Sequence, residues 1–104
     1  MAFADNLKAL PPVAHLAALA LTNAVGDVVA RIENKPGQAG SLAVYAALAA
    51  KHGAINAAAA AEGLEIYAEH TADALAHPGK HPNIDRLIGI TAPAQALGVR
   101  LIRA

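Results

Sequence analysis

Apolar and polar positions alternate with a period of two in the first third of the chain, a pattern that predicts β-strands. Over residues 13–22 both faces of the expected strand are mostly apolar, while residues 28–33 present Val, Ala and Ile on one face and Val, Arg and Glu on the other. Residues 23–27 between them include Asn, Gly and Asp, which favour a turn. The pattern therefore predicts an antiparallel hairpin near the N-terminus.

The apolar spacing changes to a helical one in the middle of the chain. Ser41 is a good N-cap for a helix that ends at His52. Asn56 is a good N-cap for a long helix from Ala57 to about His77. A glycine follows the first helix and a proline–glycine pair follows the second, and both are common stop signals.

Three shorter elements complete the prediction: a helical turn over residues 5–10, a short helix from residue 81 to about 88, and a final strand over residues 99–103. This order predicts an α+β fold. A small antiparallel sheet, made of the N-terminal hairpin and the C-terminal strand, carries two main helices and a short third on one face. The length indicates a single domain over residues 1–104.

Composition modifies this picture through the size of the core. Apolar residues make up 56% of the chain, but 29 of them are alanines and only 3% of the chain is aromatic. Alanine has little surface to bury, so the core is expected to be thin. Burial of further surface against a second copy would compensate, and we expect a homodimer.

Charge and cysteine content exclude several classes of function. Eight basic and eight acidic residues cancel, and a nucleic-acid-binding stripe of basic and aromatic residues is absent. No cysteine is present, which excludes disulfides, thiolate zinc sites and cysteine nucleophiles. The first residues lack the basic and apolar regions of a signal peptide, and no apolar run is long enough to span a membrane. We therefore expect a cytoplasmic protein.

Candidate chemistry is concentrated between residues 70 and 81, where three of the five histidines lie among acids. On the predicted long helix, His70, Asp73 and His77 fall along one stripe. Two imidazoles and a carboxylate form a ligand set suited to a divalent metal ion such as Zn²⁺. Positions i and i+7 are about 10 Å apart, however, so one ion would need help from elsewhere. The alternative is an ordinary polar helix face.

Proton transfer is a second interpretation of the same residues. A histidine beside a carboxylate can act as an acid or base near neutral pH, which makes His70, Asp73 and His81 candidate catalytic residues. Surface hydrogen bonds without catalytic consequence are the alternative.

Anion recognition is a third interpretation. Lys80 and His81 precede the predicted short helix, and Arg86 lies one turn inside it. Their charges and the helix N-terminus suit a carboxylate or phosphate, so we expect these three residues to bind a small polar or anionic ligand. Ordinary helix capping by the same segment is the alternative.

Two stretches carry a family resemblance: RIENKPGQAGSLAVY at residues 31–45, and EGLEIYAEHTAD at 62–73 with HPGKHPNIDRL at 77–87. Together they resemble a small bacterial family known as domain of unknown function 2322. The resemblance covers most of residues 1–90. It implies a bacterial cytoplasmic protein and implies no activity.

Two functions remain open from the sequence. The leading hypothesis is a site for a polar small molecule or a divalent metal ion, with acid–base chemistry by histidine and carboxylate groups. The alternative is a non-enzymatic module for homo-oligomeric interaction or regulation. The sequence leaves open whether the protein is an enzyme, and it names no cofactor beyond the divalent metal ion.

Overall fold

A computed structural model describes residues 2–104. Three strands form an antiparallel sheet in the order β2-β1-β3, where β1 spans Leu16–Thr22, β2 spans Val28–Glu33 and β3 spans Gly98–Arg103. Within these residues the helices are α1 (Phe3–Lys8), α2 (Ala39–His52), α3 (Ala57–Tyr67), α4 (Glu69–Ala76), α5 (Pro82–Gly89) and the short 3₁₀ helix η1 (Pro93–Gln95). The predicted α+β fold is confirmed.

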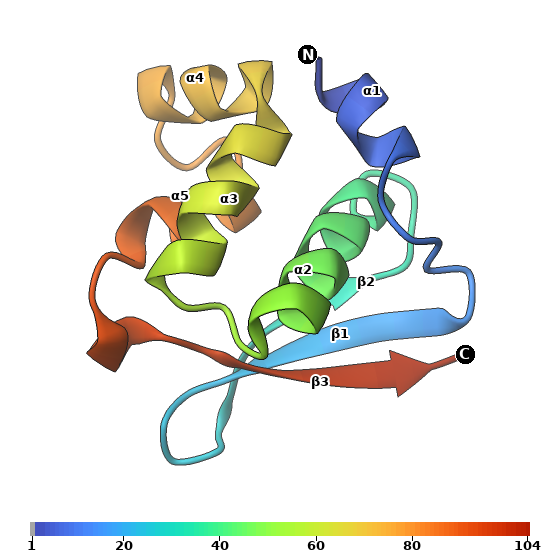
Figure 1. Ribbon diagram of the computed structural model, residues 1–104, viewed down its shortest axis with the longest axis vertical. Helices are drawn as coiled ribbons and strands as arrows, with labels where there is room; N and C mark the ends of the chain where they lie inside the picture. Colours follow the sequence, from blue (N-terminus) through green and yellow to red (C-terminus); the bar gives the residue numbers. More distant parts are fainter. Residues whose placement is uncertain (1) are drawn as a thin grey trace.

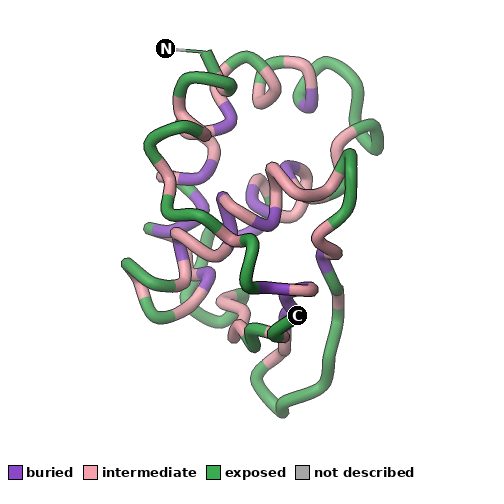
Figure 2. The backbone as a smooth tube through the Cα atoms, turned by 90° about the vertical axis from the view of Figure 1, so that its right-hand side faces the viewer, coloured by how far each residue is buried: buried purple, intermediate pink, exposed green. Residues whose placement is uncertain are grey.

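The helices lie on one side of the sheet, with α2 nearest to it and α1 and α4 farthest away (Figure 1). Buried residues concentrate between the helices and the sheet (Figure 2). Leu19 of β1 pairs with Ile32 of β2, and both are fully buried on the helix-covered face. Tyr45 and Leu48 of α2 are fully buried as well and belong to the same core. None of the helices in residues 2–104 has the length and apolar content needed to cross a bilayer.

The hairpin and the ends of several helices form as predicted. The strand over residues 28–33 is confirmed, while β1 begins at Leu16, later than expected. Gly53 ends α2 with a left-handed φ of 78°, and the Asn56 side chain accepts a hydrogen bond from the Ala59 N–H at 2.8 Å. α5 also lies within one residue of its predicted range.

The prediction that Ser41 caps α2 is wrong. The helix begins at Ala39, so Ser41 lies inside its first turn. The N–H groups of Gln38 and Ala39 both donate to the Lys35 carbonyl, which winds the chain into a turn ahead of the expected start. The Ser41 hydroxyl is consequently free to serve another purpose.

The single long helix over residues 57–77 is also wrong. The segment is two helices, α3 and α4, which meet at Ala68 with φ 52° and ψ −117°. Two of the last carbonyls of α3 have side-chain donors: Thr71 Oγ1 donates to Leu64 O at 2.6 Å, and Asn6 Nδ2 donates to Ile66 O at 2.9 Å. These donors satisfy carbonyls that a continuing helix would have used, so the chain turns.

A glycine allows the helices around the site to approach one another. At Gly63 of α3, an added Cβ would lie 2.7 Å from Leu87 Cδ1 of α5 and 2.9 Å from Leu48 Cδ1 of α2. The absence of a side chain therefore brings α3 into close contact with both neighbours. This contact fixes α5 beside the junction of α3 and α4.

Candidate functional site

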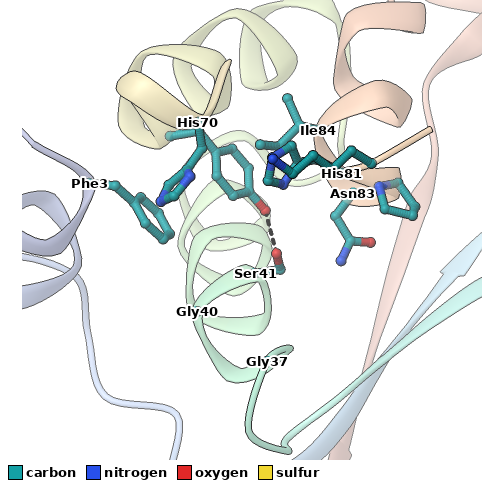
Figure 3. A pocket seen from close by; sticks show the side chains of 11 residues that line it. Phe3, Gly37, Gly40, Ser41, His70, His81, Asn83 and Ile84 are labelled. Carbon is teal, nitrogen blue, oxygen red and sulfur yellow. Dashed lines mark hydrogen bonds between the residues drawn. The ribbon is translucent and has the colours of Figure 1, made fainter. Parts of the chain in front are cut away.

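A pocket of about 380 Å³ opens on the surface where residues of five helices, α1 to α5, come together (Figure 3). α1 and α4 contribute one side, the start of α2 another, and the α4–α5 loop with the start of α5 a third. The residues that line it are Phe3, Gly37, Gly40, Ser41, Tyr67, His70, Lys80, His81, Pro82, Asn83 and Ile84.

The turn at Ala68 positions α4 over this pocket. Because the chain changes direction there, His70 leaves the line of α3 and faces α1 and the α4–α5 loop. Its ring lies 5.1 Å from the Phe3 ring in an edge-on contact and 5.7 Å from the His81 ring, measured between centroids. The turn thus brings two histidines to one pocket.

Helix α1 closes the pocket next to α4. The Phe3 backbone N–H donates to Glu69 Oε1 at 2.8 Å, and this bond lowers the pKa of the Glu69 carboxyl. The Phe3 ring stacks on the Tyr67 ring at 5.2 Å between centroids. Sequence reasoning missed Phe3, because a single aromatic residue near the N-terminus carries no local sign of a contact more than sixty residues away.

The Asp73 carboxylate contacts three basic side chains in or near the pocket. Its Oδ2 lies 2.6 Å from His81 Nε2 and 2.9 Å from Lys80 Nζ, and its Oδ1 lies 3.9 Å from His77 Nε2. Hydrogen bonds from His81 and then Lys80 lower the pKa of Asp73 to about 2. Asp73 is therefore ionised at any physiological pH.

The structure brings the three predicted catalytic residues, His70, Asp73 and His81, close together. Asp73 contacts His81 directly, whereas His70 contacts the His81 ring and Phe3. The carboxylate therefore orients one imidazole, and the second imidazole lies beside the first. Asp85 lies four residues after His81 but is not its partner, because Asp85 Oδ2 accepts a hydrogen bond from the Gly79 N–H at 2.8 Å.

The predicted metal ligands are less well arranged. His77 lies on the far side of Asp73 with its side chain 63% exposed, and it does not line the pocket. Across residues 2–104 no group of three histidine or acidic side chains is placed to hold one ion. A metal bound by His70, Asp73 and His77 stays a prediction.

Of the three predicted ligand-binding residues, Lys80 and His81 line the pocket and Arg86 does not. Arg86 Nη1 donates to Asn83 Oδ1 at 2.8 Å and to the Tyr45 hydroxyl at 3.1 Å, and its guanidinium lies over the Tyr45 ring. Burial raises the pKa of Tyr45, and the charge of Arg86 partly offsets this effect. Arg86 therefore supports the pocket from beneath by orienting Asn83.

Sequence reasoning also missed the two hydroxyl groups of the site. The Tyr67 hydroxyl donates to Ser41 Oγ at 2.7 Å, a bond drawn as the dashed line in Figure 3. Burial raises the pKa of Tyr67, so this hydroxyl keeps its proton. Ser41 in turn keeps its own O–H for a further acceptor. Both residues lie in the stretches that carry the family resemblance, but nothing in their spacing indicates that they meet, so their contact required the tertiary structure.

The lining of the pocket contains basic side chains and no acidic one. Lys80, His70 and His81 are basic, and none of the eleven lining residues is acidic. Ser41 and Asn83 add neutral polar groups, and Phe3, Tyr67 and Ile84 add apolar surface. Such a lining can bind a small molecule that has both polar and apolar parts.

Comparison with known proteins shows the family. A family model described as "Uncharacterized protein conserved in bacteria (DUF2322)" matches residues 3–101. The chain belongs to this family. The resemblance found in the sequence is thereby confirmed. No curated protein and no solved structure matches the chain.

The DUF2322 match contains the whole site. All lining residues lie between Phe3 and Ile84, inside the matched segment. The family description states no activity, so the function has to be inferred from the geometry of the pocket.

Proposed function

We propose that this protein binds a small polar molecule in the pocket beside His70 and His81. The observation that carries the proposal is that basic, hydroxyl and aromatic side chains from five separate segments line one opening of about 380 Å³. Ligand sites in proteins commonly have volumes of about 300–1,000 Å³, so this one suits a small metabolite.

The polar groups of the lining are suited to fixing a ligand in one orientation. Ser41 keeps an O–H to donate, and Asn83 keeps its amide N–H groups because its oxygen is taken by Arg86. The aromatic wall of Phe3 and Tyr67 supplies an apolar side. Convergence of His70, His81 and a lysine in one pocket favours this function over a purely structural interaction module.

Acid–base catalysis on the bound molecule is a second candidate. It is favoured by the 2.6 Å bond between Asp73 Oδ2 and His81 Nε2, which orients the ring and leaves Nδ1 to exchange a proton. Once a ligand is known, deuterium incorporation from D₂O into it, followed by mass spectrometry, would test this chemistry. Loss of the exchange in the H81Q variant is expected, and unchanged exchange would contradict it.

The binding proposal is tested with two variants of the same helix. His70 lines the pocket and His77 does not, although both lie within or directly after α4. A library of small polar metabolites is screened by ligand-detected NMR, and each hit is titrated against wild type, His70→Ala and His77→Ala. We expect His70→Ala to weaken binding by about fivefold or more, because it removes part of the wall. His77→Ala should bind like wild type.

Two results would refute the proposal. One is that no compound of the library binds saturably to the wild-type protein. The other is that every hit responds equally to both substitutions, which would place the binding outside the pocket.

A further inference from the structure

The basic groups at one side of the pocket are already held by a carboxylate. Lys80 and His81 line the pocket, and both contact Asp73 Oδ2, at 2.9 and 2.6 Å. Asp73 does not line the pocket, and its side chain is 34% exposed. The Lys80 and His81 groups that a ligand would contact in the pocket are therefore already bonded to the Asp73 carboxylate, which lies outside the pocket lining.

The charge of the lining indicates the class of ligand. A lysine and two imidazoles face the opening and no acidic side chain does, so the hydrogen-bond donors of the lining suit a negatively charged group. A carboxylate or a phosphate presents the acceptor oxygens that an ammonium group and an imidazole bind best. Asp73 presents the same kind of oxygens to the same donors.

Little core packing holds Asp73 in this position. Ala74 is the one buried residue of α4. The helix follows Ala68, which has a left-handed φ of 52°, and it precedes Gly79, which has a φ of 93°. Both ends therefore have backbone conformations unlike those of a continuous helix. The contacts of Asp73 are thus prominent among the bonds that fasten α4 to the α4–α5 loop.

We infer that Asp73 is an internal competitor of an anionic ligand, and that a carboxylate or phosphate group binds by taking Lys80 and His81 from it. This inference rests on the proposed function and adds the chemical class of the ligand and a means by which α4 responds to it. Neutralising Asp73 should therefore strengthen anion binding. Neutralising Lys80 should weaken it.

The chain contains a matched control for this test. Glu62 also accepts from a lysine and a histidine, Lys51 at 2.9 Å and His52 at 3.0 Å, and its side chain is 31% exposed. These bonds, from Lys51 first, lower the pKa of Glu62 as well. Glu62 lies outside the pocket, so Glu62→Gln releases the same kinds of cation without changing the site.

The experiment titrates inorganic phosphate and, separately, sodium acetate into ¹⁵N-labelled protein at pH 7 and constant ionic strength. Shifts of the backbone amides between residues 79 and 84, where all residues but Pro82 carry an N–H, report binding. We expect Asp73→Asn to lower the Kd for at least one anion by about three- to tenfold, the range for two released surface ion pairs. Glu62→Gln should leave the Kd unchanged. Lys80→Gln should raise the Kd, and Lys51→Gln should not, although the two lysine side chains are similarly exposed, at 58 and 64%.

The anion that responds identifies the source of the charge, phosphate or carboxylate. If Asp73→Asn weakens binding or leaves it unchanged, Asp73 positions His81 for the ligand instead of competing with it, and the inference is wrong. The same holds if neither anion shifts residues 79–84 in wild type or in Asp73→Asn. A library hit that is sensitive to His70→Ala would then leave the proposed function standing. Circular dichroism of each variant confirms that it is folded.

Discussion

Ala68 combines a good helix-forming side chain with a backbone conformation that alanine rarely adopts, φ 52° and ψ −117°. Its strain is maintained by neighbours, because Thr71 and Asn6 hold the carbonyls at the end of α3. The alanine-rich sequence around Ala68 favours a straight helix, and the strained backbone of Ala68 shows that the structure departs from it beside the pocket.

We predict that Ala68→Gly stabilises the protein. Glycine adopts a positive φ at little steric cost, and the gain exceeds its larger loss of backbone entropy on folding. The expected net effect is about 1 kcal/mol, or a rise in Tm of roughly 5 °C. Thermal unfolding monitored by circular dichroism measures it.

Ala72→Gly is the control, because Ala72 is an exposed residue inside α4. It should destabilise the protein by about 1 kcal/mol through the lower helix propensity of glycine. If Ala68→Gly lowers Tm as Ala72→Gly does, the backbone at residue 68 is not strained.

The histidines show how far residue-level inference from the sequence extends. Their interleaving with acids drew attention to His70, Asp73 and His81, and the structure brings these three residues together. The stripe drawn on a continuous helix placed His77 with them, but His77 is exposed and outside the pocket. The difference arises because the sequence gives spacing along the chain, whereas the turn at Ala68 and the loop after α4 set direction in space.

At the scale of elements, two acids link α4 to neighbouring segments of the chain. Glu69 binds the Phe3 N–H and Asp73 binds His81 and Lys80, and both carboxyls have a lowered pKa. The stabilisation from a carboxyl with a lowered pKa is complete above its ordinary pKa and is lost as the pH falls through the folded value.

We therefore predict that acid loosens α4. For Asp73 the window runs from its ordinary pKa of 3.8 down to about 2. Hydrogen exchange of the α4 amides should accelerate between pH 4 and pH 2 relative to the intrinsic rate in wild type. In Asp73→Asn, this acceleration should be smaller, because no proton is taken up at that position. Mass spectrometry of peptides covering residues 69–77 measures both.

Asp5→Asn provides the control, because Asp5 on α1 forms no ion pair within residues 2–104. Its pH profile should match that of wild type. A profile for Asp73→Asn that also matches wild type would show that the ion pairs of Asp73 do not hold α4.

At the scale of the whole molecule, the remaining question is self-association. The large apolar side chains most exposed near the sheet are Val25 in the hairpin turn and Val28 and Val29 on β2, with exposed fractions of 81, 55 and 51%. Side chains this exposed have little contact with the rest of the chain. The homodimer stays a prediction, and β2 is where we expect it to form.

Sedimentation equilibrium at micromolar concentration tests this expectation. Wild type should be a dimer, and Val29→Lys should be a monomer because it places a charge in the contact. Leu75→Lys, at an exposed leucine on α4, should remain a dimer. A monomeric wild-type protein at these concentrations would contradict the prediction.

The sequence by itself determined the kinds of element and most of their ends. The alternation over residues 28–33, the glycine after α2 and the Asn56 cap are local signals, because each acts through hydrogen bonds or φ angles within a few residues. The α+β fold follows from their order. The concentration of histidines and acids likewise pointed to the region where the pocket lies.

Only the tertiary structure decided where β3 pairs, where the long helix breaks and what the pocket contains. β3 pairs with β1, although most of the chain lies between them in sequence. Asn6 and Phe3 contact the residues around the α3–α4 junction, which follow them by more than fifty positions. These contacts depend on shape and on donors meeting distant acceptors, which leave no periodic trace in the sequence. The same contacts turn the row of histidines and acids into a pocket lined with basic groups and an adjacent carboxylate.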